Sequence, residues 1–373
     1  MHIGVLGGGQ LGRMLALAGI PLGHHFRFLD PDPDAPARLV GELISGAFDD
    51  REVLGRFADG VDVITYEFEN VPVESVEFLA KRCCVYPPPT ALKVSQDRLI
   101  EKQFAQSLGI PTPRFAPVHT LEELQTAVCR IGYPAVLKTR RFGYDGRGQW
   151  VIRQPADVAG AWASAAQVPS ILEEYVRFQR EVSLIAVRSR QGEIRSYCVV
   201  ENEHVGGILR QSLAPALRIT PDLRSQAESA AQAILNQLSY VGVLAIEFFE
   251  VDGQLLFNEM APRVHNSGHW TIEGATTSQF ENHLRAILDW PLGDTSHRGH
   301  SAMVNLIGVT PDPRSVMEIP GAHLHLYGKS PRTGRKLGHV TICAENAVDL
   351  DNRLTQLKAR LAFPDCHPCD AIG

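Results

Sequence analysis

The segment that most constrains the fold is the N-terminus, where an apolar run passes directly into a glycine-rich turn. Ile3–Leu6 is the apolar run, and Gly7–Gly12 is the turn. The residues that follow repeat apolar side chains with the spacing of one helix face: Leu11, Met14, Leu15 and Ala18. A strand that turns tightly into a helix is the opening unit of a parallel α/β sheet. We therefore predict that the chain begins with such a sheet.

Alternating strand and helix signals continue up to a run of three prolines. They predict strands at Phe26–Asp30, Val61–Phe68 and Cys83–Tyr86 and a helix near Arg51–Ala58. Pro87–Pro89 lacks backbone N–H donors and forbids both helix and central strand, which marks a domain boundary. We predict an α/β domain over residues 1–90, followed by a helix that Ser95 caps and that ends near Ser107.

The length and composition leave room for two further domains. The 373 residues include 44% hydrophobic and 21% charged residues, which is ordinary for a globular protein, and domains average roughly 150 residues. Strand signals return from Ala135 onward, and a stretch rich in Gly, Pro and Ser separates Pro291 from His300. We predict a second domain over residues 91–295 and a small, mostly-β domain over residues 296–373.

Charge, hydropathy and cysteine usage exclude several classes of protein. The net charge of −6 disfavours binding to nucleic acid through bulk positive charge. No apolar run approaches the roughly 18 residues that span a membrane, and the N-terminus lacks the layout of a signal peptide. Seven scattered cysteines predict free thiols in a reducing cytoplasm. Cys366, His367 and Cys369 have the spacing of a metal knuckle, but no second pair completes a zinc site, so we assign them no role.

The first glycine turn leaves three interpretations open, two of which involve a ligand. Gly7, Gly9 and Gly12 fit the dinucleotide-binding pattern, and Asp30 ends the second predicted strand, where such proteins bind ribose. This pattern is typical of a nicotinamide or flavin oxidoreductase. The glycines are explained at least as well by close packing of strand and helix. A third explanation is another phosphorylated or ribosyl ligand at the helix N-terminus.

A lysine beside a second glycine-rich loop indicates a polyphosphate. Lys138 ends an apolar strand, and Gly143–Gln149 contains three glycines with cations around them. Glycine amides approach phosphates closely and the lysine supplies a point charge, although an exposed hairpin tip has the same composition. Ile171–Val176 and Glu181 fit a strand that offers its backbone to adenine and a carboxylate to ribose, or a plain strand edge.

Two glutamates on one predicted hairpin form the third candidate feature. The predicted strands are Val243–Glu250 and Gln254–Met260, and they carry Glu247 and Glu259. Facing carboxylates repel unless a cation lies between them, and Mg²⁺ on nucleotide phosphates needs few protein carboxylates. The alternative is two unrelated surface glutamates.

The register of this hairpin decides whether the two glutamates converge. A two-residue turn at Asp252 and Gly253 sets Glu247 opposite Asn258 and leaves Glu259 on the other face. A three-residue loop with Gly253 at positive φ makes Glu259 a diagonal neighbour of Glu247 on the same face. We therefore predict an odd-length or bulged turn, a positive φ at Gly253, and convergence of the carboxylates.

In this order, the lysine, glycine loop, adenine-side strand and carboxylate hairpin resemble the ATP-grasp superfamily. Five motifs narrow the resemblance to the N5-carboxyaminoimidazole ribonucleotide synthetase family of purine biosynthesis: Gly7–Met14, Tyr66–Val71, Gly143–Gln149, Asn258–Thr271 and Tyr327–His339. The resemblance covers nearly the whole chain, up to about Phe363. It implies an ATP-grasp domain with a lid at about 112–175, after a Rossmann-like pre-ATP-grasp domain that binds no dinucleotide.

The resemblance also implies a reaction and a role for each matching residue. ATP would phosphorylate bicarbonate to carboxyphosphate, and the amine of 5-aminoimidazole ribonucleotide would trap this species or the CO₂ released from it. The implied ATP-binding residues are Arg98, Lys138, Gly143, Tyr144, Asp145, Gly146, Arg147, Gly148, Gln149, Glu173, Glu174, Tyr175, Val176, Glu181, His204, Asn258 and Glu259. Mg²⁺ is assigned to Glu247 and Glu259, and catalysis to Tyr144, Asp145, Arg147, Arg263, His265 and Asn266. The ribonucleotide is assigned to Gln10, Leu11, Glu67, Lys329 and Arg335.

Three rival functions remain open. Another ATP-grasp ligase, such as a formate-dependent ribonucleotide transformylase or a biotin carboxylase-like enzyme, shares the nucleotide motifs. An oxidoreductase would use Gly7–Gly12, and a non-catalytic nucleotide sensor would not need both Glu247 and Glu259. The basic run from Lys329 to Lys336 fits a phosphate site or a solvated surface. The family implies a homodimer, and neither nucleic acid nor a membrane is expected as a partner.

Overall fold

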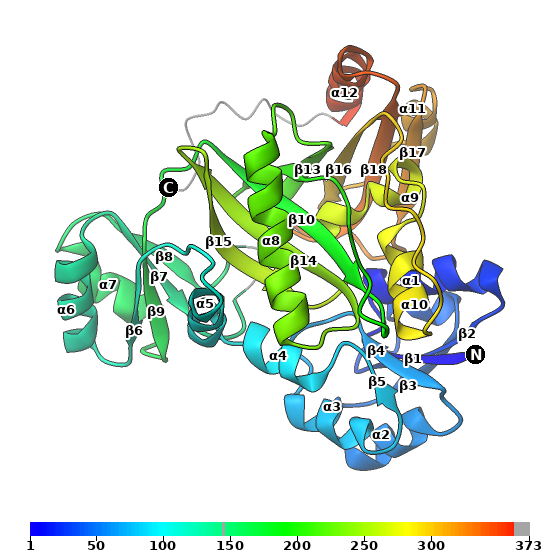
Figure 1. The fold of residues 1–373 in the computed structure, drawn as a ribbon, viewed down its shortest axis with the longest axis horizontal. Coiled ribbons are helices and arrows are strands. Elements are labelled where there is room, and N and C mark those ends of the chain that lie inside the picture. The colour runs from blue at the N-terminus through cyan, green and yellow to red at the C-terminus, as the bar shows by residue number, and fades with distance from the viewer. Residues whose placement is uncertain (144–145, 362–373) are drawn as a thin grey trace.

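Three β-sheets organise the molecule (Figure 1). The computed structural model describes residues 1–143 and 146–361, which form a five-stranded, a four-stranded and a nine-stranded sheet. In Figure 1 the five-stranded sheet lies at the lower right, the four-stranded sheet at the left, and the nine-stranded sheet between and above them. The first sheet is parallel and the other two are antiparallel, so the predicted α/β and α+β classes are both confirmed.

The N-terminal domain is built from the predicted strand–turn–helix units. Its strand order is β3-β2-β1-β4-β5. The strands are β1 (His2–Leu6), β2 (His25–Asp30), β3 (Glu42–Ser45), β4 (Val63–Tyr66) and β5 (Cys84–Val85). The helices are α1 (Gln10–Gly19), α2 (Arg51–Ala58) and α3 (Val73–Ala80), with 3₁₀ turns at Ile20–Leu22 and Pro36–Leu39. Helix α3 and strand β3 were not predicted. Strand β3 has only two apolar residues, which are adjacent and show no strand period.

Two predictions just after this domain are wrong. Helix α4 (Pro89–Ser95) begins inside the proline run, because Pro89 occupies the first helical position, where no N–H group is needed. Ser95 ends α4 and does not cap the next helix, α5 (Arg98–Ser107). Asp97 is the cap, since its carboxylate accepts two backbone N–H groups of the first turn of α5.

The four-stranded sheet forms a separate lobe at the left of Figure 1. Its order is β6-β9-β7-β8, and its elements are β6 (Phe115–Val118), α6 (Leu121–Ile131), β7 (Ala135–Thr139), β8 (Gln149–Ile152), α7 (Asp157–Ser164) and β9 (Ser170–Glu174). Helices α6 and α7 pack on this sheet around a core of their own, which includes Leu124 and Trp162. The lobe covers the residues for which we predict a lid, and the domain boundaries themselves stay a prediction.

The central sheet has the order β15-β14-β10-β12-β13-β16-β18-β17, with β11 paired to β10. Its strands are β10 (Arg180–Arg188), β11 (Ile194–Ser196), β12 (Val200–Val205), β13 (Ile208–Ala214), β14 (Gly242–Val251), β15 (Gln254–Ala261), β16 (His300–Ile307), β17 (Ala322–Leu326) and β18 (Lys336–Ala344). The remaining helices are α8 (Pro221–Gln237), α9 (Thr271–Gly274), α10 (Gln279–Ile287), α11 (Pro313–Met317) and α12 (Ala347–Leu361), with a 3₁₀ turn at Asn266–Gly268. The C-terminal strands extend the sheet of the middle domain, because β16 pairs with β13.

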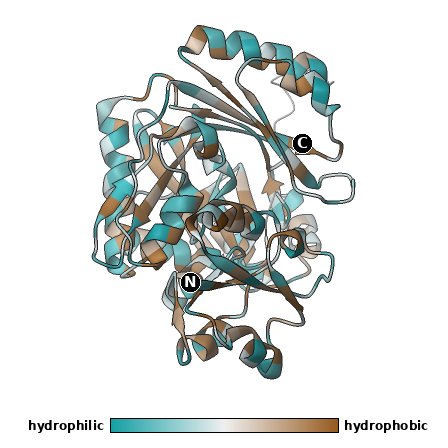
Figure 2. Ribbon diagram, turned by 90° about the vertical axis from the view of Figure 1, so that its right-hand side faces the viewer, coloured by the Kyte–Doolittle hydropathy of each residue, from teal (hydrophilic) through white to brown (hydrophobic). Residues whose placement is uncertain are grey.

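Both faces of the central sheet are buried, and its side chains alternate between two cores. On β10, Val182 and Leu184 face the core under α8, whereas Ile185 and Val187 face the core shared with α1 and α10. This second core joins the N-terminal domain to the central sheet. Figure 2 shows the apolar colour mainly on the inner strands and the polar colour on the outer faces of the helices. Among the described residues, no helix is both long enough and apolar enough to cross a membrane.

Candidate active site

A cavity of about 200 Å³ is lined by residues from the N-terminal domain, the middle domain and the C-terminal strands. We call it the central cavity. The predicted site residues that line it are Gln10, Leu11, Arg98, Gly143, Glu247, Glu259, Arg263, His265 and Asn266. Glu69, Glu101, Arg140 and Lys336 also line it and were not predicted as site residues. The cavity therefore brings together residues from all five sequence motifs.

The turn of the glutamate hairpin differs from the prediction. Val251 pairs with Gln254, so the turn has two residues, and the predicted three-residue loop is wrong. Both turn residues have positive φ, 49° at Asp252 and 78° at Gly253, which confirms the expectation for Gly253. A two-residue turn of this kind matches the twist of the flanking strands.

The two glutamates nevertheless converge, because the register shifts within the strand. Phe248 pairs with Phe257, whereas Glu247 pairs with Glu259, so Asn258 is an extra residue in a β-bulge. The bulge sets Glu247 and Glu259 directly opposite each other, and both line the central cavity. The predicted convergence is therefore confirmed, although the bulge lies in the strand and not in the turn.

The carboxyl groups of Glu247 and Glu259 have opposite pKa shifts. Burial raises the pKa of Glu247 to about 7; His204 opposes this rise and Glu259 adds to it. Burial also disfavours the charged form of Glu259, but Arg98 and Lys138 together outweigh it and lower its pKa to about 2. Arg98 Nη1 lies 2.9 Å from Glu259 Oε2. The negative charge of Glu259 disfavours ionisation of Glu247. A further cation between the two carboxylates would remove this repulsion, so the pair is suited to bind one.

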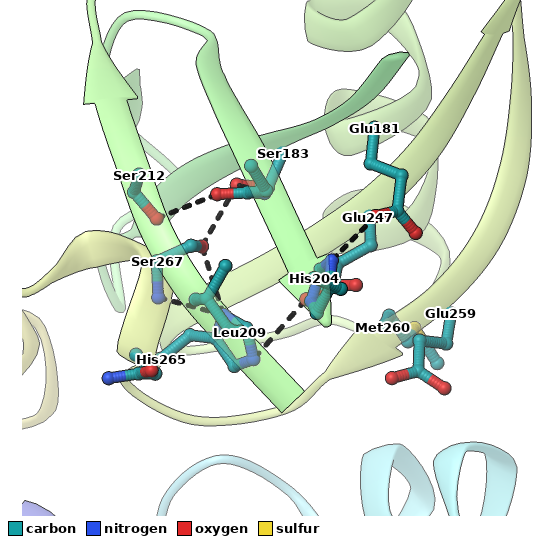
Figure 3. A network of polar contacts seen from close by, with 12 residues as sticks. Glu181, Ser183, His204, Leu209, Ser212, Glu247, Glu259, Met260, His265 and Ser267 are labelled. Atoms are coloured by element: carbon teal, nitrogen blue, oxygen red, sulfur yellow. Dashed lines mark hydrogen bonds and ion pairs between the residues drawn. The ribbon is translucent and has the colours of Figure 1, made fainter. Parts of the chain in front are cut away.

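One imidazole lies among these carboxylates (Figure 3). His204 Nδ1 is 2.7 Å from Glu181 Oε2. Burial lowers the pKa of His204, but the hydrogen bond to Glu181 and the charge of Glu247 outweigh burial and raise it to about 9. Among the described residues, no three His, Cys, Asp or Glu side chains are grouped so that they could hold a metal ion unaided.

Residues 263–267, which we call the anion loop, follow the hairpin directly. Arg263 forms an ion pair with Glu69 of the N-terminal domain, and both side chains line the cavity. Burial, with the charges of Arg263 and Lys336, lowers the pKa of His265 to about 3, so this imidazole is neutral near pH 7. His265 Nε2 lies 3.5 Å from Glu247 Oε1.

Two buried amides from other elements hold the anion loop. Gln279 accepts the backbone N–H of His265 at 2.9 Å and donates to its carbonyl at 2.7 Å. Asn305 on β16 exchanges hydrogen bonds in both directions with the side chain of Asn266, one of them at 3.0 Å. Both amides are fully buried, so water does not compete for these contacts. The loop therefore presents its polar atoms to the cavity in a fixed arrangement.

A buried charge cluster links the four-stranded lobe to α5. Glu173 Oε2 lies 3.0 Å from Lys138 Nζ and 3.5 Å from Lys102 Nζ, and all three residues are buried. Burial disfavours ionised Glu173, but the two lysines together outweigh it and lower its pKa to about 2. Its neighbour Glu101 differs, because burial and Glu259 raise the pKa of Glu101 to about 8. The side chain of Glu173 thus pairs with lysines in this structure.

The second glycine loop lies against the cavity, although part of it falls outside the described residues. Tyr144 and Asp145 are not described, so their predicted roles have no structural account. The carbonyl of Gly143 accepts from Arg98 Nη2 at 3.5 Å. Gly146 has φ 75°, and a side chain there would come within 2.7 Å of the carbonyl of Gly206 in the β12–β13 turn. Glycine is required at this close approach, which brings the loop to the hairpin that carries His204.

The other predicted nucleotide-binding residues described by the structure lie in the second glycine loop, on β8, and at the end of β9. Arg147 and Gly148 follow in the loop, and Gln149 pairs with Lys138 between β8 and β7. The side chain of Glu174 binds Arg114 at 2.6 Å, so the predicted contact with adenine would fall to its backbone. Tyr175 and Val176 follow directly after β9, where both are partly buried.

The predicted ribonucleotide residues meet on the N-terminal side of the cavity. Lys329 Nζ donates to Gln10 Oε1 across the interface between the first and last parts of the chain. Burial lowers the pKa of Lys329; Glu67 opposes this shift, and Arg335 adds to it. Gln10, Glu67 and Arg335 therefore all lie close enough to Lys329 to interact with it, and Leu11 lines the cavity beside Gln10.

The glycine amides of the first turn are already hydrogen-bonded within the chain. The carboxylate of Glu67 accepts the N–H groups of Gly9 and, at 2.6 Å, Gly12, while Asp30 accepts that of Gly8 at 2.7 Å. These carboxylates occupy the positions that a pyrophosphate would take at the helix N-terminus. A side chain at Gly7 would lie 2.5 Å from Glu67, so the glycines serve close packing.

Several residues that interact with partners far along the chain were not predicted. Glu69 lies in a quoted motif, but its ion pair with Arg263 spans 194 positions. Arg140 binds Asp97 through two hydrogen bonds at 2.9 and 2.8 Å, and Lys102 donates to the carbonyl of Phe257 at 3.0 Å. The sequence feature that could have indicated them is the cluster of charged residues Arg98, Glu101 and Lys102 at the start of α5. Cys366, His367 and Cys369 lie outside the described residues.

Comparisons with known proteins agree with this three-part arrangement. Family models match in order: the ribonucleotide synthetase preATP-grasp domain at residues 1–96, the ATP-grasp domain at 103–280, and the phosphoribosylaminoimidazole carboxylase C-terminal domain at 301–353. The N5-carboxyaminoimidazole ribonucleotide synthase of Pseudomonas aeruginosa is 54% identical over 360 residues, which are 96% of this chain and 99% of that protein. The chain belongs to the N5-carboxyaminoimidazole ribonucleotide synthase family.

Solved structures of the N5-carboxyaminoimidazole ribonucleotide synthase family share the fold. The synthetase of Thermus thermophilus is 55% identical, with a TM-score of 0.94 over 98% of this chain and all of that chain. The Aspergillus clavatus enzyme, solved with ADP and 5-aminoimidazole ribonucleotide, is 31% identical, with a TM-score of 0.90 over 96% of this chain and 98% of that chain. The chain is an ATP-grasp ligase of purine biosynthesis that carboxylates 5-aminoimidazole ribonucleotide at the expense of ATP. The oxidoreductase and sensor hypotheses are thereby wrong.

Proposed function

We propose that bicarbonate is the carboxyl source and that the central cavity is where it is activated and transferred. The observation that carries this proposal is the direct pairing of Glu247 with Glu259 beside the anion loop. Opposed acidic groups favour a bound Mg²⁺, and the adjacent arginine and amides favour small oxyanions. When bound, Mg²⁺ would neutralise the phosphate charge that develops during transfer.

The nucleotide is proposed to lie between the lid and the central sheet. Lys138 and the amides of the second glycine loop, from Gly143 to Gln149, would contact phosphates, and Glu181 and His204 would contact the ribose. The backbone from Glu173 to Val176 would hold adenine. Arg98 and Asn258 would lie at the phosphate end, since Arg98 contacts Glu259 and Asn258 is the bulge beside it.

The anion loop would hold bicarbonate and carboxyphosphate. Arg263 and Asn266 offer hydrogen-bond donors to the oxygens, and neutral His265 offers one more. Tyr144, Asp145 and Arg147 are proposed to exclude water when the loop closes, because carboxyphosphate hydrolyses readily. The chemistry assigned to these side chains is electrostatic stabilisation and orientation.

The ribonucleotide is proposed to lie between Gln10, Leu11 and Glu67 on one side and Lys329 and Arg335 on the other. The cations would bind its phosphate. Two broader expectations are also proposals: a homodimer, and a cytoplasmic location. The described cysteines are all free thiols, which supports a reducing compartment.

The experiment that tests the proposal is coupled ADP release with each substrate omitted in turn. We expect ADP release to need ATP, Mg²⁺, bicarbonate and 5-aminoimidazole ribonucleotide together, and formate not to replace bicarbonate. ADP release that ignored both bicarbonate and the ribonucleotide would contradict the proposal.

A further inference from the structure

A chain of buried polar side chains runs from the middle of the central sheet to the anion loop (Figure 3). Ser212 Oγ lies 2.8 Å from Asn202 Oδ1, Asn202 Nδ2 lies 2.9 Å from Ser183 Oγ, and Ser183 Oγ lies 2.9 Å from Ser267 Oγ. Ser267 Oγ in turn lies 2.9 Å from His265 Nδ1. We call Ser212, Asn202, Ser183 and Ser267 the polar relay. Three of its members are fully buried and Asn202 is only 6% exposed, so water does not compete for these hydrogen bonds.

The direction of each hydrogen bond in the polar relay follows from what each group can donate. An amide nitrogen such as Asn202 Nδ2 only donates, so Ser183 Oγ is its acceptor. The hydroxyl proton of Ser183 is then directed to Ser267 Oγ, and the proton of Ser267 is directed to His265 Nδ1. All the donors point toward the imidazole.

A backbone group fixes the same direction independently. The N–H of Ser267 donates to His265 Nδ1 at 3.3 Å. Because a backbone N–H never accepts, Nδ1 of His265 carries no proton. A neutral imidazole has its single proton on the other nitrogen, Nε2, which lies 3.5 Å from Glu247 Oε1 at the edge of the central cavity.

We propose that the polar relay is a set of positioning residues that fix His265 in its Nε2–H form, so that this side chain donates a hydrogen bond into the cavity. In this form His265 neither ligates a metal through Nε2 nor takes a proton from substrate there. Its ligand is an oxyanion, bicarbonate or the phosphorylated carboxylate derived from it. The inference rests on the proposed function for the identity of that oxyanion, but not for the tautomer.

The test combines nitrogen NMR of the full-length chain, with ¹⁵N-labelled histidine, and steady-state kinetics. A His265→Asn variant identifies the His265 signals by their disappearance. We expect the wild-type imidazole to show a protonated Nε2 and an unprotonated, hydrogen-bonded Nδ1. In Ser267→Ala the Nδ1 signal should shift toward that of a more weakly hydrogen-bonded ring nitrogen, because only the longer bond from the backbone N–H of residue 267 remains. Its kcat should fall about 5- to 10-fold, as expected for one lost hydrogen bond, with KM for ATP unchanged.

Two further variants separate positioning from general packing. Ser183→Ala removes the donor to Ser267 and should shift the Nδ1 signal and lower kcat in the same direction by a smaller amount. Ser301→Ala is the matched control, because Ser301 is equally buried on β16 but its hydroxyl contacts the thiol of Cys343, away from the polar relay. It should leave the His265 signals and kcat unchanged.

The outcomes are distinct from those that test the proposed function. A proton on Nδ1 in the wild-type chain would overturn the inference, and so would a fall in kcat in Ser267→Ala without any change at the His265 nitrogens. Should Ser267→Ala fail to fold, Ser183→Ala alone decides between these results. A wild-type chain with the Nε2–H signal but no bicarbonate-dependent ADP release would contradict the proposed function and leave the tautomer standing.

Discussion

A single extra residue, Asn258, gives the glutamate hairpin its chemistry. With a two-residue turn and a regular ladder, Glu247 would oppose Asn258, and Glu259 would lie on the opposite face of the sheet. The bulge takes Asn258 out of the ladder and sets the two carboxylates opposite each other. Residue types and spacing in the sequence identified both glutamates, but they did not place the bulge in the strand, because the position of a bulge depends on how neighbouring strands pack.

Replacing either glutamate should weaken the metal site. In Glu247→Gln or Glu259→Gln a charged oxygen is replaced by a neutral amide, which we expect to cost about 1.5–3 kcal/mol in Mg²⁺ binding. The Mg²⁺ concentration for half-maximal ADP release should therefore rise about tenfold or more. Glu203→Gln, an exposed residue on β12, is the control and should behave as wild type. An unchanged Mg²⁺ titration in both cavity variants would remove the metal assignment.

Helix α5 shows which features of a helix cannot be predicted from its own sequence. A helix ending near Ser107 was predicted from the cap and stop signals around it, and the helix is present, but its actual cap and its buried charges could not be predicted. Glu101 and Lys102 are 1% and 2% exposed, because α5 packs against β15 and the lid rather than facing water. Charged residues on a helix normally indicate an exposed face, and only their partners, distant in sequence, reverse that expectation.

In the buried cluster of Lys102, Lys138 and Glu173, the stability of the folded chain should depend on the single carboxylate of Glu173. Glu173→Gln leaves two buried lysines without a counter-charge, and removing one partner of a buried ion pair typically costs about 3–5 kcal/mol. Urea unfolding at pH 7 should detect this loss. Glu174→Gln is the matched control from the same strand, where the ion pair with Arg114 lies near the surface, so the change should be below about 1 kcal/mol.

The pH dependence of unfolding gives the same cluster a second test. The pKa of Glu173 is about 2 in the folded chain, against an ordinary value of 4.5. The stabilisation is therefore fully present above pH 4.5 and is lost as the pH falls toward 2, by about 3 kcal/mol over that range. In Glu173→Gln the free energy of unfolding should therefore fall less between pH 4.5 and 2 than in wild type. A variant that loses stability with acid as steeply as wild type would contradict the role of the cluster.

At the scale of the whole molecule, the site exists only where three parts of the chain meet. The order of the elements and the five motifs were enough to predict the fold class, since strand and helix periods are local signals. The continuous central sheet was not predictable, because pairing of β13 with β16 joins residues about 90 positions apart, across a stretch that signals a boundary. Contacts such as Lys329 with Gln10, 319 positions apart, depend on that assembly.

The ribonucleotide should therefore bridge the first and last parts of the chain and stabilise both. At 100 times its dissociation constant, a ligand stabilises the folded state by about 2.7 kcal/mol, which is about 3 °C in Tm for a chain of this length. In Lys329→Ala, loss of a charge-assisted phosphate contact should reduce the shift at the same ribonucleotide concentration to about 1 °C. The shift with Mg²⁺ and ATP should be unchanged, because Lys329 interacts with Gln10 and Glu67 of the N-terminal domain, to which we assign the ribonucleotide. Lys358→Ala, an exposed lysine on α12, is the control. Equal ribonucleotide shifts in Lys329→Ala and wild type would mean that the substrate phosphate binds elsewhere.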